Sequence, residues 1–206
     1  MGDRFFLEPK RRYFDSLIRL QPHNPKALIQ RGMVHFKQGK IAEAIADFDT
    51  AESLQPDLTP YLWQRGLAYY YRDRFAEGAK QFEIDLTVNA RDVEETVWRY
   101  LCQARLKTPT EAQKDLKPVR NDPRPILRQI YALFAGECTS EAVLAAGQQD
   151  SPTAQFYSHL YVGLYGEATG NETQAQTHIT QAATGYKLDD YMWYLAWVHG
   201  ELRGWL

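Results

Sequence analysis

The chain has 206 residues, of which 44% are hydrophobic and 24% are charged, and its formal net charge at pH 7 is −2. This composition is ordinary for a globular protein, and the near-neutral charge argues against generic nucleic-acid binding, which needs a basic face to neutralise phosphates. No apolar run approaches the roughly 20 residues that span a bilayer. Cys102 and Cys138 are too few for a disulfide framework and favour a reducing compartment, although one bridge between them stays open.

The first expected helix runs from about residue 3 to Leu20, with an apolar stripe that includes Phe14 and Leu17. It has the phase of the second helix of a repeat, without a first helix to pair with. A half-repeat of this kind typically caps the end of a repeat array. Within it, Lys10-Arg11-Arg12 is the densest basic run of the chain, and we interpret it as a solvated helix face.

The next segment repeats itself at a period of 34 residues. Gln30-Arg31-Gly32 returns as Gln64-Arg65-Gly66, and Leu20-Gln21-Pro22 returns as Leu54-Gln55-Pro56. This period is that of tetratricopeptide arrays, in which each unit is a helix, a turn and a second helix. One such unit cannot bury its apolar face alone, so neighbouring units stack and leave a concave surface.

The first repeat is predicted as two helices, over residues 25–38 and 41–54. Asn24 is the expected N-cap, Gly39 ends the first helix, and Pro56 forbids continuation of the second. Six residues occupy the signature positions of the tetratricopeptide consensus: Leu28, Gly32, Ala44, Phe48, Ala51 and Pro56. We expect Gly32 and Ala44 to lie where the two helices cross closely.

The second repeat is expected to begin at Thr59-Pro60, with Gly66 and Phe82 in the phase of the first repeat. It departs from the consensus at Gly78, Asp85 and Ala90. Beyond Arg91 the period fails, but further helices are predicted over residues 96–106, 109–116, 126–135 and 140–146, then in a repeat-like unit after Pro152 and in a final helix from Asp189 or Asp190 to about Arg203.

We therefore predict an all-α fold, a right-handed superhelix of about a dozen antiparallel helices in a single domain over residues 1–206. Its expected parts are a capping helix at 1–22, two regular tetratricopeptide units at 25–90, irregular helix pairs at 91–150, and a repeat-like unit with a C-terminal helix at 151–206.

Residues 61–74, Val97-Trp98-Arg99-Tyr100-Leu101 and Gln155-Phe156-Tyr157 resemble the NlpI-type bacterial lipoproteins, as does the aromatic final helix. The resemblance covers roughly residues 25–200. It implies an all-helical tetratricopeptide adaptor of the kind that brings a protease to peptidoglycan hydrolases and forms homodimers through terminal helices. The lipid-anchored leader of that family is missing, so we expect the adaptor architecture alone to apply, in the cytoplasm or a plastid stroma.

The inward positions of the first helices predict an aromatic groove that binds a protein segment. The candidate partner-binding residues are Met33, Phe36, Trp63, Leu67, Tyr70, Tyr71 and Trp98. Tyr and Trp offer large contact areas with few rotors, and a peptide or helix with apolar anchors suits such a surface. The alternative is that later helices of the same chain fill part of it.

The final helix is a second candidate surface, because it is more aromatic than one helix face needs. Tyr191, Tyr194 and Trp197 are either a homodimer contact or a cap on the array. The alternative function that follows is an assembly factor or subunit of a larger complex, docked through this helix.

Two arginines stand where tetratricopeptide units usually have leucine. A buried guanidinium needs a partner, and Asp47 is the expected partner of Arg31; Arg65 occupies the same slot one repeat later. The five histidines show no metal-ligand spacing, and there is no phosphate loop, nucleophile elbow or zinc signature. We expect a non-catalytic protein without cofactor, metal or nucleic-acid partner.

Overall fold

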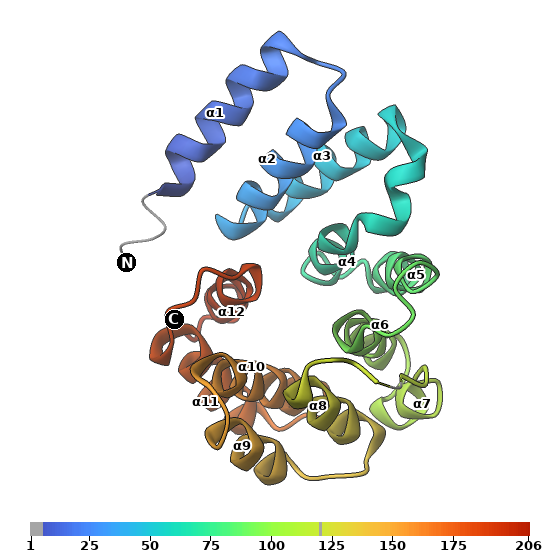
Figure 1. Cartoon of the computed structure of the whole chain (residues 1–206), viewed down its shortest axis with the longest axis vertical. Helices are drawn as coiled ribbons and strands as arrows, with labels where there is room; N and C mark the ends of the chain where they lie inside the picture. Colours follow the sequence, from blue (N-terminus) through green and yellow to red (C-terminus); the bar gives the residue numbers. More distant parts are fainter. Residues whose placement is uncertain (1–5, 120) are drawn as a thin grey trace. The chain divides into compact units, whose positions relative to one another are not determined.

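The computed structural model describes residues 6–119 and 121–206, and within these ranges the chain is helical and has no strand (Figure 1). Successive helices pack in antiparallel pairs, so the all-α prediction is confirmed. Contacts divide the chain into two compact units, Met1–Val88 and Asn89–Leu206. The single domain stays a prediction.

The first unit contains two helical repeats preceded by one helix. Its elements are α1 (Leu7–Leu20), α2 (Pro25–Lys37), α3 (Ile41–Leu54), the 3-10 helix η2 (Pro56–Tyr61), α4 (Trp63–Tyr70) and α5 (Phe75–Asp85). α2 packs on α3, α4 packs on α5, and α1 packs on α2. The bounds of α2 and α3 confirm the sequence prediction to within one residue, whereas the predicted start of α1 at residue 3 lies outside the described residues.

Local signals explain the bounds of α2. The Asn24 side chain accepts a hydrogen bond from the Ala27 amide at 3.1 Å, which satisfies one of the free amides of the first turn. Pro25 occupies the first helical position, where its missing N–H costs nothing. Gly39 ends the helix with φ at 73°, in the left-handed region that favours glycine.

The second repeat differs from the prediction at its start. Thr59-Pro60 does not begin the first helix of this repeat; it lies in η2, and α4 begins at Trp63. The Thr59 hydroxyl donates to the Glu52 carboxylate and lies within hydrogen-bonding distance of the Pro56 carbonyl, 2.7 Å from each, so η2 is held against α3. Pro60 lies inside η2 and is not the first residue of an α-helix.

Glycines make the close helix crossings that the period predicts. A Cβ on Gly32 would lie 2.9 Å from the ring of Phe48, and one on Gly66 would lie 2.7 Å from the ring of Phe82. Both rings are buried. The aromatic side chain of each second helix therefore packs directly on the backbone of the first helix of its own repeat.

The second unit consists of helices of unequal length. They are α6 (Val93–Leu106), α7 (Pro109–Lys114), α8 (Pro125–Ala135), α9 (Ser140–Gln148), α10 (Pro152–Ala168), α11 (Glu172–Gly185) and α12 (Tyr191–Leu202). α10 and α11 form a repeat-like pair, with Gly163 against Ile179. Asp190, and not Asp189, caps α12 through the Met192 amide at 2.7 Å.

Two further findings concern the whole of the described chain. No helix in it combines the length and the apolar character that crossing a bilayer requires. Cys102 and Cys138 are free thiols, the first buried and the second half-buried, so the bridge that the sequence left open is not formed.

Candidate functional site

The first unit gathers aromatic rings from three segments. Tyr71, which follows α4, meets the ring of Phe36 on α2 edge to face, with centroids 5.7 Å apart. Tyr70 packs at 5.4 Å from Tyr71 and at 5.5 Å from Phe75 on α5. Edge-to-face pairs of this kind stabilise the folded state beyond what the burial of their apolar area contributes. Phe75 was not among the predicted site residues; it joins the cluster because α5 folds back on α4.

The predicted groove residues of this unit fall into two sets. Phe36, Leu67 and Tyr70 are buried, whereas Met33, Trp63 and Tyr71 are half-buried. The Met33 sulfur lies 3.9 Å from the Gln64 side-chain amide, which joins α2 to α4. The half-buried residues are those whose side chains reach the surface, so the partner-binding prediction depends on them.

The remaining candidates belong to the second unit. Trp98 on α6 and Tyr194 on α12 are buried, and Tyr191 and Trp197 are half-buried. α12 packs on α11, and the rings of Trp193 and Trp197 lie 6.2 Å apart. The two interpretations of this helix, a cap or a dimer contact, both stay predictions.

Arg31 makes the ion pair that the sequence predicts. Its guanidinium donates to both oxygens of Asp47 on the paired helix α3, at 2.9 and 2.6 Å. It also reaches back to Asp15 on α1 at 3.1 Å, a contact that the sequence analysis did not foresee. One guanidinium thus links the repeat to the helix before it.

Arg65 repeats this arrangement one period later and is more deeply buried, with only 5% of its surface exposed. Gln81 stands at the position of Asp47 and accepts two hydrogen bonds from the guanidinium, at 2.9 and 2.7 Å. From the preceding helix α3, Glu52 accepts at 2.6 and 2.7 Å and Asp49 accepts at 3.1 Å. The hydrogen bonds from Arg65 and Thr59 lower the pKa of Glu52 to about 2.

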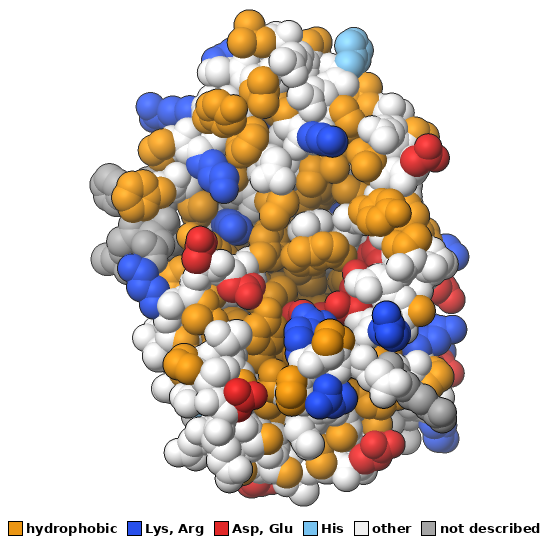
Figure 2. Space-filling model, viewed as in Figure 1, with side chains coloured by type: hydrophobic (Ala, Val, Ile, Leu, Met, Phe, Trp, Pro, Cys, Tyr) orange, Lys and Arg blue, Asp and Glu red, His pale blue; other side chains and the backbone are white. Residues whose placement is uncertain are grey.

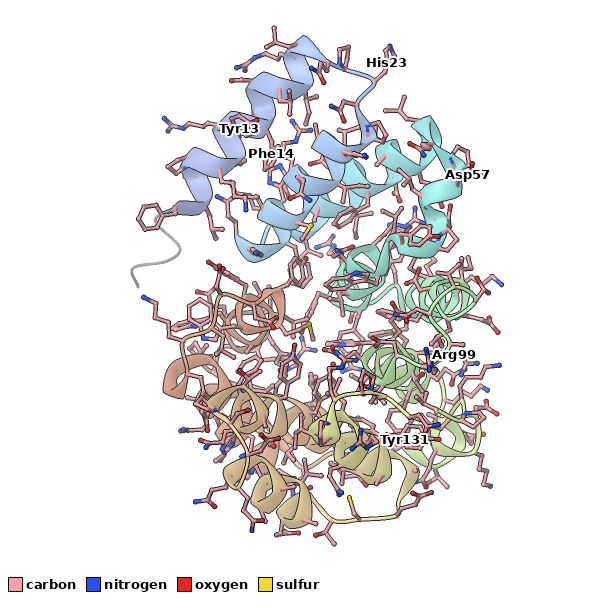
Figure 3. The ribbon with its side chains drawn as sticks, in the orientation of Figure 1. Tyr13, Phe14, His23, Asp57, Arg99 and Tyr131 are labelled. Atoms are coloured by element: carbon pink, nitrogen blue, oxygen red, sulfur yellow. The ribbon has the colours of Figure 1, made fainter. Side chains whose placement is uncertain are left out.

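An arginine stands at this repeat position a third time, in the second unit. Arg99, labelled in Figure 3, donates to the backbone carbonyl of Asp115 at 3.0 Å and to Gln103 at 3.1 Å. Asp115 lies one period after Gln81. The arginine spacing therefore continues past the point where the consensus residues stop, which sequence analysis by apolar positions missed.

Arg124, which is outside the 34-residue spacing, holds the start of α6. It pairs with Asp92 at 3.1 Å, Glu94 at 2.5 Å and Asp122 at 2.8 Å. Asp122 also accepts from the Val93 amide in the first turn of α6. These bonds tie the segment before α8 to the helix, so this charged cluster has a structural role.

Asp85 is a buried carboxyl group beside Arg65. One of its oxygens accepts from the Gln81 amide at 2.6 Å, and the other has no hydrogen-bond partner. Burial raises the pKa of Asp85 to about 7, against the opposing effects of Gln81 and Arg65. Since the ordinary value is 3.8, the folded state holds a proton between about pH 4 and 7 that the unfolded state has lost.

Asp85→Asn is therefore expected to stabilise the first unit at pH 8 by about 2 kcal/mol and to leave it almost unchanged at pH 4. The amide keeps the acceptor for Gln81 and removes the buried charge. The measurement is urea unfolding of wild type and variant across this pH range. In wild type, the contribution of Asp85 to stability should fall as pH rises from about 4 to 7, and the variant should lack this pH dependence. If the free energies of unfolding of the two proteins change in parallel with pH, the raised pKa of Asp85 is contradicted.

Comparison with known proteins agrees with the repeat geometry. No curated protein gives a significant match to the chain. The family model of the tetratricopeptide repeat matches residues 25–58, which comprise α2, α3 and the start of η2. Residues 25–58 are therefore a tetratricopeptide repeat.

Proposed function

We propose that the protein is a non-catalytic interaction scaffold that binds a protein segment on the aromatic surface of its first unit, here defined as Met33, Trp63 and Tyr71. The observation that carries the proposal is the tetratricopeptide repeat at residues 25–58, a module that typically binds proteins and is typically non-catalytic. Phe36, Leu67 and Tyr70 support this surface from below and are not expected to contact the partner extensively.

The chemistry of the surface suits an apolar segment. Trp63 and Tyr71 offer rings with few rotors to freeze, and Met33 is a flexible side chain that adapts to varied partners. A peptide or helix with one or two apolar anchors fits such a surface. The resemblance to NlpI-type adaptors points to the same class of function, in which one protein is brought to another.

The test is affinity capture with matched variants. Trp63→Ala combined with Tyr71→Ala should abolish capture of the partner and leave the far-ultraviolet circular dichroism unchanged, because both side chains are half-buried. Tyr61→Ala is the control, since Tyr61 is an exposed aromatic residue of the same unit. Retained capture by the double variant, or equal loss in the control, would contradict the proposal.

A second candidate is an assembly factor or subunit that docks through α12. Half-buried Tyr191 and Trp197 on α12 favour it, because Tyr and Trp are enriched at protein interfaces. Truncation of α12 would also remove its packing on α11, so a point variant, Trp197→Ser, is the cleaner comparison. Loss of association in this variant alone, with capture by the first unit intact, would favour the second candidate.

A further inference from the structure

The outer face of α1 carries large apolar side chains in open solvent. Phe6, Tyr13 and Leu20 are 73%, 63% and 81% exposed. Each lies about two helical turns from the next, so the three form one stripe along the helix. Figure 2 shows hydrophobic side chains interspersed with those of Lys and Arg over the region of α1. A stripe of this size on a short helix needs an explanation beyond scattered surface hydrophobicity.

The repeat phase shows what normally covers this face. Lys10 and Tyr13 of α1 stand one period before Ala44 and Asp47 of α3, which α2 buries. In α1 the equivalent positions are exposed, although the helix has the phase of a second repeat helix. Tyr13 is held in place by the edge-to-face contact of its ring with Phe14, 5.2 Å away (Figure 3). The middle of the face therefore has the position of a helix-binding surface, whereas Phe6 and Leu20 stand one period before Lys40 and Leu54, which are exposed.

The charge around the stripe is positive. Lys10, Arg12 and Arg19 are exposed beside it. Glu8 accepts from Arg11 at 2.7 Å and from Arg12 at 3.2 Å, and Asp15 pairs with Arg31 at 3.1 Å towards α2. α1 still has four basic side chains against these two acidic ones. The rim of the stripe therefore complements a negatively charged partner and repels a second copy of itself.

We propose that the α1 outer face, defined as Phe6, Tyr13, Leu20, Lys10, Arg12 and Arg19, binds an acidic amphipathic α-helix of a partner protein. The apolar side of that helix covers the stripe, which extends over about 20 Å, and its carboxylates meet the three cations. The side chains of Lys10 and Tyr13 are larger than those of Ala44 and Asp47, so the incoming helix lies further out than α2 does on α3. This surface is separate from the aromatic surface of the first unit, so the inference stands without the proposed function.

The test uses the full chain and two labelled peptide probes of about 20 residues. One has Leu at helical spacing flanked by Glu, and the other has Lys in place of each Glu. In fluorescence anisotropy, the Glu probe should bind at least about tenfold more tightly than the Lys probe, and added salt should weaken it. Equal binding of the two probes overturns the proposal.

Three variants locate the binding. Tyr13→Glu with Leu20→Glu should weaken the Glu probe at least about tenfold, and Lys10→Glu with Arg12→Glu should do the same without touching the apolar stripe. Tyr61→Glu is the matched control, because Tyr61 is 61% exposed on η2 and should leave affinity unchanged. All are exposed positions, and circular dichroism verifies the fold.

The wild type and these variants also distinguish two other occupants of the face, a second copy of the chain and a membrane surface. If light scattering shows a wild-type dimer that Tyr13→Glu with Leu20→Glu dissociates, the face is a self-interface and the proposal fails. If wild type sediments with phosphatidylglycerol vesicles and ignores the Glu probe, the face is a membrane-surface site and the proposal fails. Probe binding that depends on both pairs of residues supports it.

Discussion

Arg65→Ala is expected to lower the free energy of unfolding of the first unit by about 3–5 kcal/mol. The guanidinium donates five hydrogen bonds: two to Gln81, two to Glu52 and one to Asp49. Its removal leaves these three acceptors facing one another without a cation. Removing one partner of a buried network costs far more than the net energy of the pair, because buried Gln81 stays desolvated and its side-chain oxygen loses both donors. Urea unfolding at pH 7 measures the loss.

The acidic partner gives this prediction a pH signature. The pKa of Glu52 is lowered from 4.5 to about 2 in the folded state, so its contribution to stability is present above pH 4.5 and is lost as pH falls towards 2. The gap between wild type and Arg65→Ala should narrow over that window. Arg72→Ala is the control, because Arg72 is an exposed arginine near the end of α4 and should change stability by less than about 0.5 kcal/mol. A loss of that small size for Arg65→Ala would show that the network is not stabilising.

Phe82→Ala is expected to destabilise the same unit by about 3–5 kcal/mol, because the ring is buried and packs directly on Gly66. Gly66→Ala should cost about 1–3 kcal/mol from the opposite cause, since its Cβ would lie 2.7 Å from Phe82 Cζ. Thermal and urea unfolding of the two variants measure both losses.

A double-mutant cycle shows whether these two losses share one contact. In a Phe82→Leu background the ring atoms nearest to Gly66 are gone, so Gly66→Ala should cost less and could even gain from the higher helix propensity of alanine. Additive losses would mean that the glycine and the ring act independently, which would contradict the close crossing.

Much of the first repeat could be predicted because its boundaries have chemical markers. Asn24, Pro25 and Gly39 each leave one favourable conformation, and the structure has α2 and α3 where these residues imply them. The second repeat was less predictable at its start, because Pro56 and Pro60 both fit a helix start, and the choice depends on the tertiary bond from Thr59 to Glu52. Asp73 takes the left-handed conformation that Gly39 has one period earlier. An aspartate does not predict this conformation as a glycine does, because non-glycine residues adopt it rarely.

The site was predictable where two helices of one repeat face each other. The pair of Arg31 and Asp47 follows from helix phase alone. Glu52 could not be foreseen as the partner of Arg65, because it comes from the preceding repeat and replaces the charge that Gln81 lacks. Nor could sequence position separate buried Tyr70 from half-buried Tyr71, since neighbouring aromatic residues differ only in the contacts that folding creates.

The arginine slot has a consequence for how such a chain could lengthen. Arg31 and Arg65 each bond to one group of the second helix of their own repeat and to acidic side chains of the helix before it, as Arg31 does with Asp47 and Asp15. A tandem duplication of one period would copy the donor together with both kinds of acceptor. The arginine of the new unit would then have acceptors on both helices, so this pairing would not hinder growth of the array by gene duplication.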